Sequence, residues 1–169
     1  MAASAKRPRE ACRGADSGAV LVLERFLPYR LSILTNHVSQ AIADLYAQRF
    51  GIGVTEWRVI AVLGRFPGSS ANQVADYTAM DKVAVSRAVA RLLERGLITR
   101  RRHATDRRRS VLALSAEGRR IHAGIAPLAL GIEQRILAAL RPRERDLLFR
   151  LLDRLDALDL HAEVAGQGV

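Results

Sequence analysis

The sequence is poor in the residues that build disulfides and metal sites. Its 169 residues include one cysteine, Cys12, so no disulfide can form within the chain and no cysteine cluster has the spacing of zinc ligands. The four histidines are scattered and lack the i, i+4 pairing of a helical metal site. The sequence has no glycine-rich phosphate loop, nucleophile elbow or metalloprotease motif. We therefore expect a protein that is not an enzyme and that uses no metal and no cofactor.

Long hydrophobic runs and aromatic residues are also scarce. No apolar run reaches the roughly 18 residues of a membrane helix, and no apolar segment follows the basic residues of the N-terminus, so neither a membrane span nor a signal peptide is predicted. Aromatic residues make up 5% of the chain and hydrophobic residues 49%, a balance that favours helices packed through aliphatic side chains. We expect a mainly helical, cytoplasmic protein with no membrane partner.

Acidic residues are few relative to basic ones. Lysine and arginine number 27, aspartate and glutamate 17, and the formal net charge is +10. Such an excess of one sign repels itself in a folded protein, and a polyanion is the partner that balances it best. The charge therefore indicates nucleic acid before any motif is considered.

The first part of the chain has helical periodicity. Apolar residues at spacings of three and four predict one long helix over about residues 20–50. Gly51 and Gly53 should end this helix. Thr55 is the expected N-cap of a short, buried helix that stops before Pro67.

Two further short helices follow, each with a capping residue at its start. Ser70, with Gln73 three residues later, forms a capping-box pattern, and Asp81 can cap the next helix. The inward stripe of that second helix consists of Val85, Val89, Leu92 and Leu93. Two short helices joined by a tight turn are typical of a helix-turn-helix.

The other side of this second helix carries small and basic residues. Small side chains between basic ones allow close approach to the edges of bases. The positions that we expect to contact DNA are Lys82, Val83, Ala84, Ser86, Arg87 and Arg91. Exposed arginines are also ordinary solvated side chains, but residues 81–109 carry ten lysines and arginines against three acids, which favours DNA binding.

Two apolar stretches flank the segment RRRHATDRRRS, residues 100–110. The alternation of Leu112 and Leu114 predicts a half-buried strand, so the segment should form the tip of a β-hairpin. Its six arginines can neutralise phosphates on both sides of a minor groove. Asp106 either stabilises the turn or accepts a hydrogen bond from Arg108 and holds that side chain extended. The predicted fold is mainly α with a small β-wing, a winged helix-turn-helix domain.

The stretch DKVAVSRAVARLLERGLITRRRHATDRRRSVLALSAEG, residues 81–118, resembles the MarR family of bacterial transcriptional regulators. The motifs that carry the resemblance occur in the family's order: Asp-Lys at the start of the second helix, then Ser-Arg, LLERGLI at the end of that helix, DRR in the wing and LSAEG after the second strand. The resemblance implies a repressor that is associated with the bacterial nucleoid when it binds DNA. The positions that it implicates are Ser86, Arg87 and Arg91 on the recognition helix and the pair Asp106 and Arg108 in the wing. Arg107, between that pair, is also expected to contact DNA. Ser115 stands where the family usually has threonine and keeps the helix cap.

The rest of the chain is more apolar than a small winged domain can cover. Residues 1–18, small, charged and interrupted by glycine and proline, predict a disordered basic tail. We expect residues 19–53 and 119–162 to form a helical dimerisation region and residues 54–118 the winged helix-turn-helix DNA-binding domain. The homodimer would bind a pseudo-palindromic site in double-stranded DNA; an intrachain helical bundle is the alternative. Pro127 is expected to kink or break its helix.

The resemblance also implies a small-molecule effector, commonly an aromatic carboxylate, that releases the regulator from its operator. Arg30 and His37 lie beside the apolar seam of the first helix, near the place where Trp57 and Arg58 of the next helix should pack. A guanidinium, an imidazole and an indole suit such a ligand. The same residues are also compatible with a solvated flank, an interhelical ion pair and ordinary core packing.

Two other functions stay open. Some relatives in this family sense peroxides through an N-terminal cysteine, and Cys12 lies near the N-terminus between two arginines. A protein that coats DNA without sequence preference also fits the charge, although small and basic residues on one helix face favour base readout.

Overall fold

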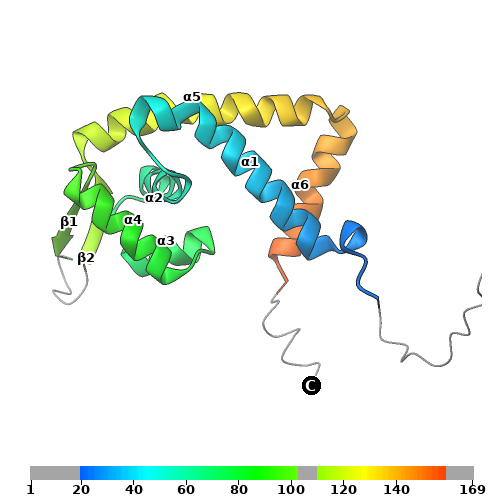
Figure 1. Ribbon diagram of the computed structural model, residues 1–169, viewed down its shortest axis with the longest axis horizontal. Coiled ribbons are helices and arrows are strands. Elements are labelled where there is room, and N and C mark those ends of the chain that lie inside the picture. The colour runs from blue at the N-terminus through cyan, green and yellow to red at the C-terminus, as the bar shows by residue number, and fades with distance from the viewer. Residues whose placement is uncertain (1–19, 103–109, 159–169) are drawn as a thin grey trace, which may run out of the picture. The chain divides into compact units, whose positions relative to one another are not determined.

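Helices make up most of the structure. The computed structural model describes residues 20–102 and 110–158. In chain order the elements are η1 (Leu23–Arg25), α1 (Leu27–Phe50), α2 (Val54–Arg65), α3 (Ala71–Thr78), α4 (Lys82–Glu94), β1 (Ile98–Arg102), β2 (Ser110–Leu114), α5 (Ala116–Ala138) and α6 (Pro142–Asp156) (Figure 1). The mainly helical fold with a small β-wing that the sequence predicts is confirmed.

The chain divides into two compact units. Residues up to Asn36 form the first unit and residues from His37 onward form the second. In the first unit, η1 and the start of α1 expose large apolar side chains such as Leu27 and Leu34. The helix expected from about residue 20 begins instead at Leu27, because Pro28 is compatible with the first turn of a helix and not with its interior.

Side-chain caps define where the two central helices of the second unit begin. Ser70 Oγ accepts a hydrogen bond from the Gln73 N–H at 3.3 Å at the start of α3. Asp81 accepts from the N–H groups of Val83 and Ala84, at 3.0 and 2.9 Å, at the start of α4. Both caps satisfy donors that have no partner within the helix, and both predictions are confirmed.

The predicted cap of α2 is wrong. Helix α2 begins at Val54, and Gly53 rather than Thr55 is its N-cap. The Gly53 N–H donates to Glu56 Oε2 at 2.8 Å, so a glutamate at the third helical position satisfies the cap backbone. Glycine can therefore cap this helix without a side-chain oxygen, because the glutamate three residues later accepts a hydrogen bond from the glycine N–H.

The hydrophobic core of the second unit forms where α2, α3 and α4 pack together, with the sheet and residues of α1 and α5 around them. The large side chains that are fully buried are Tyr46, Ile52, Val59, Ile60, Leu63, Val74, Val85, Val89, Leu92, Leu112 and Ile125. The inward stripe predicted for α4 is confirmed at Val85, Val89 and Leu92, and Leu93 is partly buried against the same cluster.

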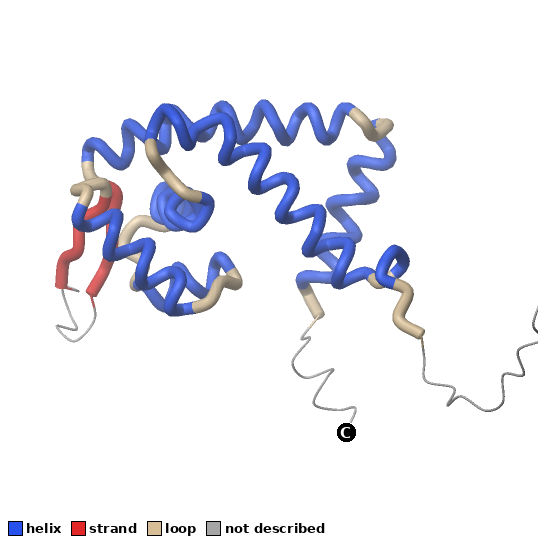
Figure 2. The backbone as a smooth tube through the Cα atoms, viewed as in Figure 1, coloured by secondary structure: helices blue, strands red, loops and turns tan. Residues whose placement is uncertain are grey.

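The two strands form an antiparallel hairpin that follows α4. Ile98 lies opposite Leu114 at the base of the hairpin, and Figure 2 shows the strands side by side in red. Leu112 and Leu114 are buried, as their alternation predicts. The backbone of Leu112 also bonds the turn between α2 and α3, accepting from Gly68 and donating to Ser69 at 2.9 Å each. The hairpin is therefore attached to the helices as well as to itself.

Helix α5 leaves the hairpin through a tightly packed first turn. Ser115 Oγ caps the helix by accepting from the Gly118 N–H at 3.0 Å, as the sequence predicts for Ser115. A Cβ atom on Gly118 would lie 1.9 Å from the carbonyl oxygen of Leu97. Only glycine fits at this position, because the two backbones meet there.

Helix α5 continues through Pro127 from Ala116 to Ala138, so of the predicted kink or break the break does not occur, and the kink stays a prediction. Ile121 and Ile125 are buried in the core, and this packing holds the preceding turns helical in spite of the missing N–H. Within residues 20–102 and 110–158, no single helix is long and apolar enough to span a membrane; α5 and α6 pass that test of length and composition only as a bent pair, at 114° to each other.

Candidate nucleic-acid interface

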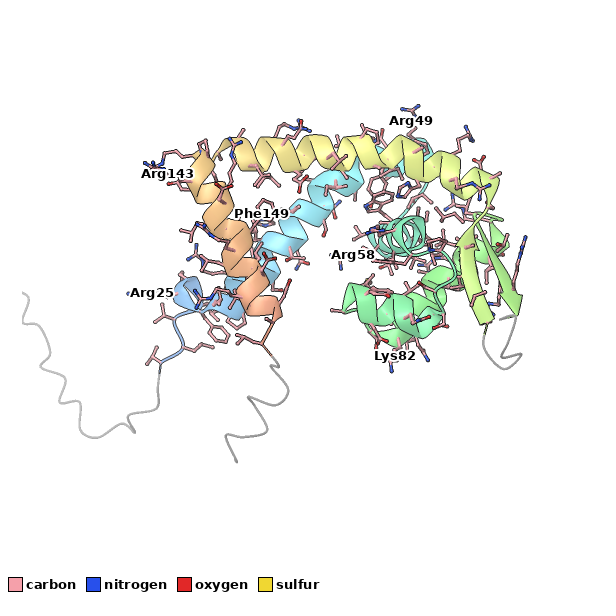
Figure 3. All side chains as sticks on the ribbon, turned by 180° about the vertical axis from the view of Figure 1, so that it is seen from behind. Arg25, Arg49, Arg58, Lys82, Arg143 and Phe149 are labelled. Carbon is pink, nitrogen blue, oxygen red and sulfur yellow. The ribbon has the colours of Figure 1, made fainter. Side chains whose placement is uncertain are left out.

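Helix α4 separates its buried face from an exposed, basic one. Lys82, Ser86 and Arg87 are exposed, Val83 is 56% exposed, and Ala84 is partly buried. Figure 3 shows the Lys82 side chain pointing outward from the start of α4. Four of these five positions are therefore exposed as expected, and Ala84 is exposed in part. The contact of all five with DNA stays a prediction.

Arg91, the sixth position predicted on this helix, has a partner within the protein. Its Nε donates to Glu56 Oε1 at 2.8 Å, although 54% of the Arg91 side chain remains exposed. A guanidinium has several donors, so this bond does not prevent the others from meeting a phosphate. Its first role in the structure is nevertheless to join α4 to α2.

Glu56 was not identified from the sequence, and it is the one charged residue that is buried within residues 20–102 and 110–158, with 7% of its surface exposed. Burial raises the pKa of Glu56, but hydrogen bonds from Gly53 and Arg91 and the charges of Arg91 and Arg95 outweigh burial, so the pKa lies below its ordinary value. Arg95 Nη1 lies 3.9 Å from Glu56 Oε2. The carboxylate is therefore ionised and held between the start of α2 and the second half of α4.

The hairpin adds positive charge beside α4. Arg100 and Arg101 of β1 are exposed. The wing-tip residues Asp106, Arg107 and Arg108 lie outside the described residues, and their roles stay predictions. Cys12 and the predicted basic tail also lie outside them.

Two of the four residues predicted to bind an effector, Trp57 and Arg58, contact side chains of neighbouring helices. Trp57 is half-buried, with its ring centroid 6.0 Å from that of Tyr46 and 5.8 Å from that of His122. Arg58 Nη2 donates to Ser39 Oγ of α1 at 2.9 Å, and Figure 3 marks Arg58 on α2. The helix that carries Trp57 and Arg58 thus packs near α1 as predicted, with the tryptophan less buried than expected.

The other two predicted effector residues are exposed. His37 is exposed on α1, and Arg30 is exposed in the first unit. Their part in a ligand site stays a prediction.

Tyr46 is a polar residue of this region that the sequence did not single out. It is fully buried, and its hydroxyl makes no hydrogen bond among the residues that the structure describes. Burial raises the pKa of Tyr46 to about 12, the charge of Arg58 lowers it, and the charge of Glu56 raises it. Its hydroxyl is therefore protonated at neutral pH and able to donate to an acceptor.

A cavity of about 370 Å³ lies where the end of α2, strand β2 and the start of α5 meet. It is lined by Leu63, Gly64, Pro67, Ala113, Leu114, Arg119 and His122. None of the four predicted effector residues lines it, but His122 does, and the His122 ring also contacts Trp57.

Comparison with known proteins agrees with this geometry. The model of the MarR family matches residues 50–109. The HTH-type transcriptional regulator BilQ of Clostridium symbiosum is 31% identical over 108 residues, which are 64% of this chain and 75% of BilQ. The crystal structure of a MarR/EmrR family transcriptional regulator from Acinetobacter sp. ADP1 is 32% identical, with a TM-score of 0.74, over 80% of this chain and 96% of that one.

A third similar protein is the PcaV transcriptional regulator of Streptomyces coelicolor, solved in complex with its natural ligand. It is 25% identical, with a TM-score of 0.66, over 83% of this chain and 99% of PcaV. These relatives are transcriptional regulators and not enzymes. The capped helix-turn-helix, the hairpin beside it and the similarity over most of the chain agree: the protein belongs to the MarR family of transcriptional regulators, which regulate transcription by binding DNA through a winged helix-turn-helix.

Proposed function

We propose that the protein is a homodimeric repressor that binds a pseudo-palindromic site in double-stranded DNA and is released by a small aromatic carboxylate. The observation that carries the proposal is the face of α4, where Lys82, Ser86 and Arg87 are exposed while the opposite face is fixed in the core. A protein with this partner acts in the cytoplasm, at the bacterial nucleoid.

We assign α4 as the recognition helix. Asp81 holds the first turn of α4 through two N–H groups, which keeps that end of the helix regular and exposed. Val83 and Ala84 are small enough to let the helix approach the floor of a major groove. Arg87, one turn further on, can donate two hydrogen bonds to a guanine, and Lys82 can pair with a phosphate.

We assign the hairpin as the element that follows the adjacent minor groove. Arg100 and Arg101 extend the basic surface along β1 toward the tip. Asp106, Arg107 and Arg108 are proposed to meet the DNA there, because a narrow minor groove has a strongly negative potential that attracts arginine.

We assign dimerisation to the helices outside the winged domain. None of the residues of α6 is buried. The large apolar residues exposed on α6 are Leu147, Phe149, Leu151, Leu152 and Leu155. Such a surface costs free energy in water, and a self-complementary contact between two copies removes it. A two-fold dimer would place its recognition helices in successive major grooves, about one helical turn of DNA apart.

Sequence preference tests this function directly. A duplex is selected with the wild-type protein from a pool of randomised sequences, and its affinity is compared with that of a random duplex at physiological salt. We expect the selected duplex to bind about 1,000-fold more tightly or better, as specific regulators do. A ratio near one would overturn the proposal and favour a protein that coats DNA through charge alone.

The effector assignment rests on residues of α1 and α2. Arg58 offers a cation, Trp57 a flat apolar surface and Tyr46 a buried hydroxyl without a partner among the described residues. An aromatic carboxylate can use all three, through an ion pair, ring stacking and an accepted hydrogen bond. The natural ligand in the structure of PcaV is consistent with a ligand-responsive member of this family.

Thermal unfolding with a panel of aromatic carboxylates, each matched with its neutral amide, tests the effector assignment. At a concentration about 100 times its Kd, a bound acid should stabilise the wild-type protein by about 2.7 kcal/mol, and its amide should not. The Arg58→Ala variant should lose this response, while Arg143→Ala, which removes an exposed charge from α6, should keep it. An equal response in all three proteins would contradict the role of Arg58.

A further inference from the structure

The buried carboxylate of Glu56 joins three parts of the second unit. It accepts from the Gly53 N–H at 2.8 Å, which belongs to the turn between α1 and α2. It accepts from Arg91 Nε of α4, also at 2.8 Å, and lies 3.9 Å from the guanidinium of Arg95 just beyond α4. One carboxylate on α2 is thus bound both to the turn before α2 and to the end of the recognition helix.

Arg95 extends this connection to the end of α1. Its Nη1 donates to the carbonyl of Gly51 at 2.7 Å and its Nη2 to the carbonyl of Phe50 at 3.0 Å. These carbonyls lie at the C-terminus of α1, where a helix presents partial negative charge to a cation. Gly51 has a φ of +60°, a conformation that favours glycine and gives the end of the helix a defined shape.

This set of bonds restricts α4 in a way that its apolar face does not. Val85, Val89 and Leu92 bury aliphatic side chains against α2 and α3, and aliphatic contacts tolerate small rotations and shifts of a helix. A buried carboxylate tolerates little, since any movement that removes its donors leaves a charge without partners away from water. The end of α4 must therefore keep its distance and angle to the end of α1.

We propose that Glu56, Arg91 and Arg95 form a clamp that fixes the recognition helix relative to the end of α1, and that this clamp sets how strictly the protein discriminates between DNA sequences. The inference rests on the proposed function of α4 and α1. Since α1 belongs to the assigned dimerisation region, the clamp links the two-fold axis of the dimer to the helix that enters the groove. Glu56 then acts as a positioning residue that does not touch DNA.

The Glu56→Gln variant tests the clamp because geometry and charge predict opposite results. Removal of a buried negative charge from a basic DNA-binding domain should by itself tighten binding to every duplex. Loss of the clamp should instead weaken binding to the selected duplex about 10-fold and leave random DNA bound as tightly or more tightly. The ratio of the affinity for the selected duplex to the affinity for random DNA should therefore fall at least 10-fold.

The matched control is Glu94→Gln, which makes the same change of charge at an exposed position at the end of α4. We expect slightly tighter binding to both duplexes and an unchanged ratio. Circular dichroism at the assay temperature should show both variants folded. If Glu56→Gln behaves like Glu94→Gln, the clamp does not set discrimination and the proposal is overturned.

A second variant keeps the test independent of the folding of Glu56→Gln. Arg95→Lys retains the positive charge, but an ammonium cannot span the two carbonyls and the carboxylate as a guanidinium does. We expect the ratio to fall several-fold with an unchanged salt dependence, since no charge is removed. An unchanged ratio would contradict the clamp.

A double-mutant cycle distinguishes the two possible roles of Arg91, which are to hold α4 through Glu56 and to bind DNA directly. If Arg91 acts through Glu56, Arg91→Gln and Glu56→Gln together should affect the ratio no more than either change alone. Additive effects, with a salt slope lowered only by Arg91→Gln, would show that Arg91 binds DNA directly and not as part of the clamp.

Hydrogen exchange without DNA distinguishes failure of the clamp from failure of the proposed function. In Glu56→Gln, the amides in the second half of α4 should exchange at least 10-fold faster than in wild type, while those of α5 keep their rates. Suppose that these amides exchange faster but that the wild-type protein binds the selected and random duplexes equally well. The proposed function would then be overturned, while the clamp would remain as a structural feature. If the amides of α4 exchange at the same rate in Glu56→Gln as in wild type, the clamp is overturned, whatever the DNA-binding results are.

Discussion

The Lys82→Ala/Arg87→Ala variant should bind the selected duplex at least about 100-fold more weakly than the wild-type protein, because base and phosphate interactions of about 1–3 kcal/mol each are removed from both subunits. Both side chains are exposed on α4, and their removal leaves the buried face unchanged. Electrophoretic mobility shift at several salt concentrations measures both the affinity and its salt dependence.

The salt dependence distinguishes direct binding to phosphates from a general reduction of charge. Removal of each ion pair with a phosphate should lower the slope of log affinity against log salt by about 0.9, so this double variant should have a visibly shallower slope. The control, Arg143→Ala/Arg150→Ala, removes the same charge from exposed positions of α6. We expect it to change affinity less than about threefold, since charges distant from DNA are screened over about 10 Å. Equal reductions in affinity for the two variants would contradict the assignment of α4.

The second large effect is expected from the apolar face of α6. Leu151→Arg/Leu155→Arg places charges where the proposed interface buries two exposed leucines from each subunit. Size-exclusion chromatography with light scattering should find the wild-type protein at twice the 18.6 kDa mass of the chain and the variant at that mass. Affinity for the selected duplex should fall about 1,000-fold, because the variant no longer gains from binding two half-sites at once.

Charge alone predicts the opposite change for this variant, since two added arginines per chain attract DNA more strongly. Asp146→Asn/Asp153→Asn is the matched control: it raises the net charge equally, on the side of α6 opposite the leucines, and removes no apolar surface. It should remain a dimer and bind at least as tightly as the wild type. A wild-type monomer at micromolar concentration would exclude the dimer and favour a bundle within one chain.

Local signals in the sequence predicted the local features of the fold. Ser70, Asp81 and Ser115 cap helices because a side-chain oxygen satisfies N–H groups two or three residues away, and this geometry depends on spacing alone. The buried stripe of α4 and the alternation of Leu112 and Leu114 were predictable for the same reason. These features define the winged helix-turn-helix and the exposed face of α4.

Features that depend on distant contacts could not be predicted in this way. Glu56 pairs with arginines 35 and more positions later, and no local pattern marks a carboxylate that tertiary packing will bury. The Gly53–Glu56 spacing is a local sign of the cap of α2, but threonine is the more usual capping residue, and its presence at position 55 favoured the wrong start. The low helix propensity of Pro127 predicts a break, and the burial of its neighbours in the core overrides that propensity.

The neighbours of the predicted effector residues also depend on distant contacts. The apolar pattern placed Arg30 and His37 beside one seam of the first helix, but such a pattern does not show which neighbouring element meets that side. The structure instead surrounds Trp57 with Tyr46 and His122, two residues on different helices that the pattern of α1 alone did not connect.

Hydroxyl-radical footprinting of the selected duplex tests most directly whether paired recognition helices and their hairpins bind one face of DNA. The account predicts two protected tracts, related by the pseudo-dyad of the site and about one helical turn apart, and predicts that Lys82→Ala/Arg87→Ala loses both together. A single protected tract, or uniform protection along random and selected duplexes alike, would contradict it.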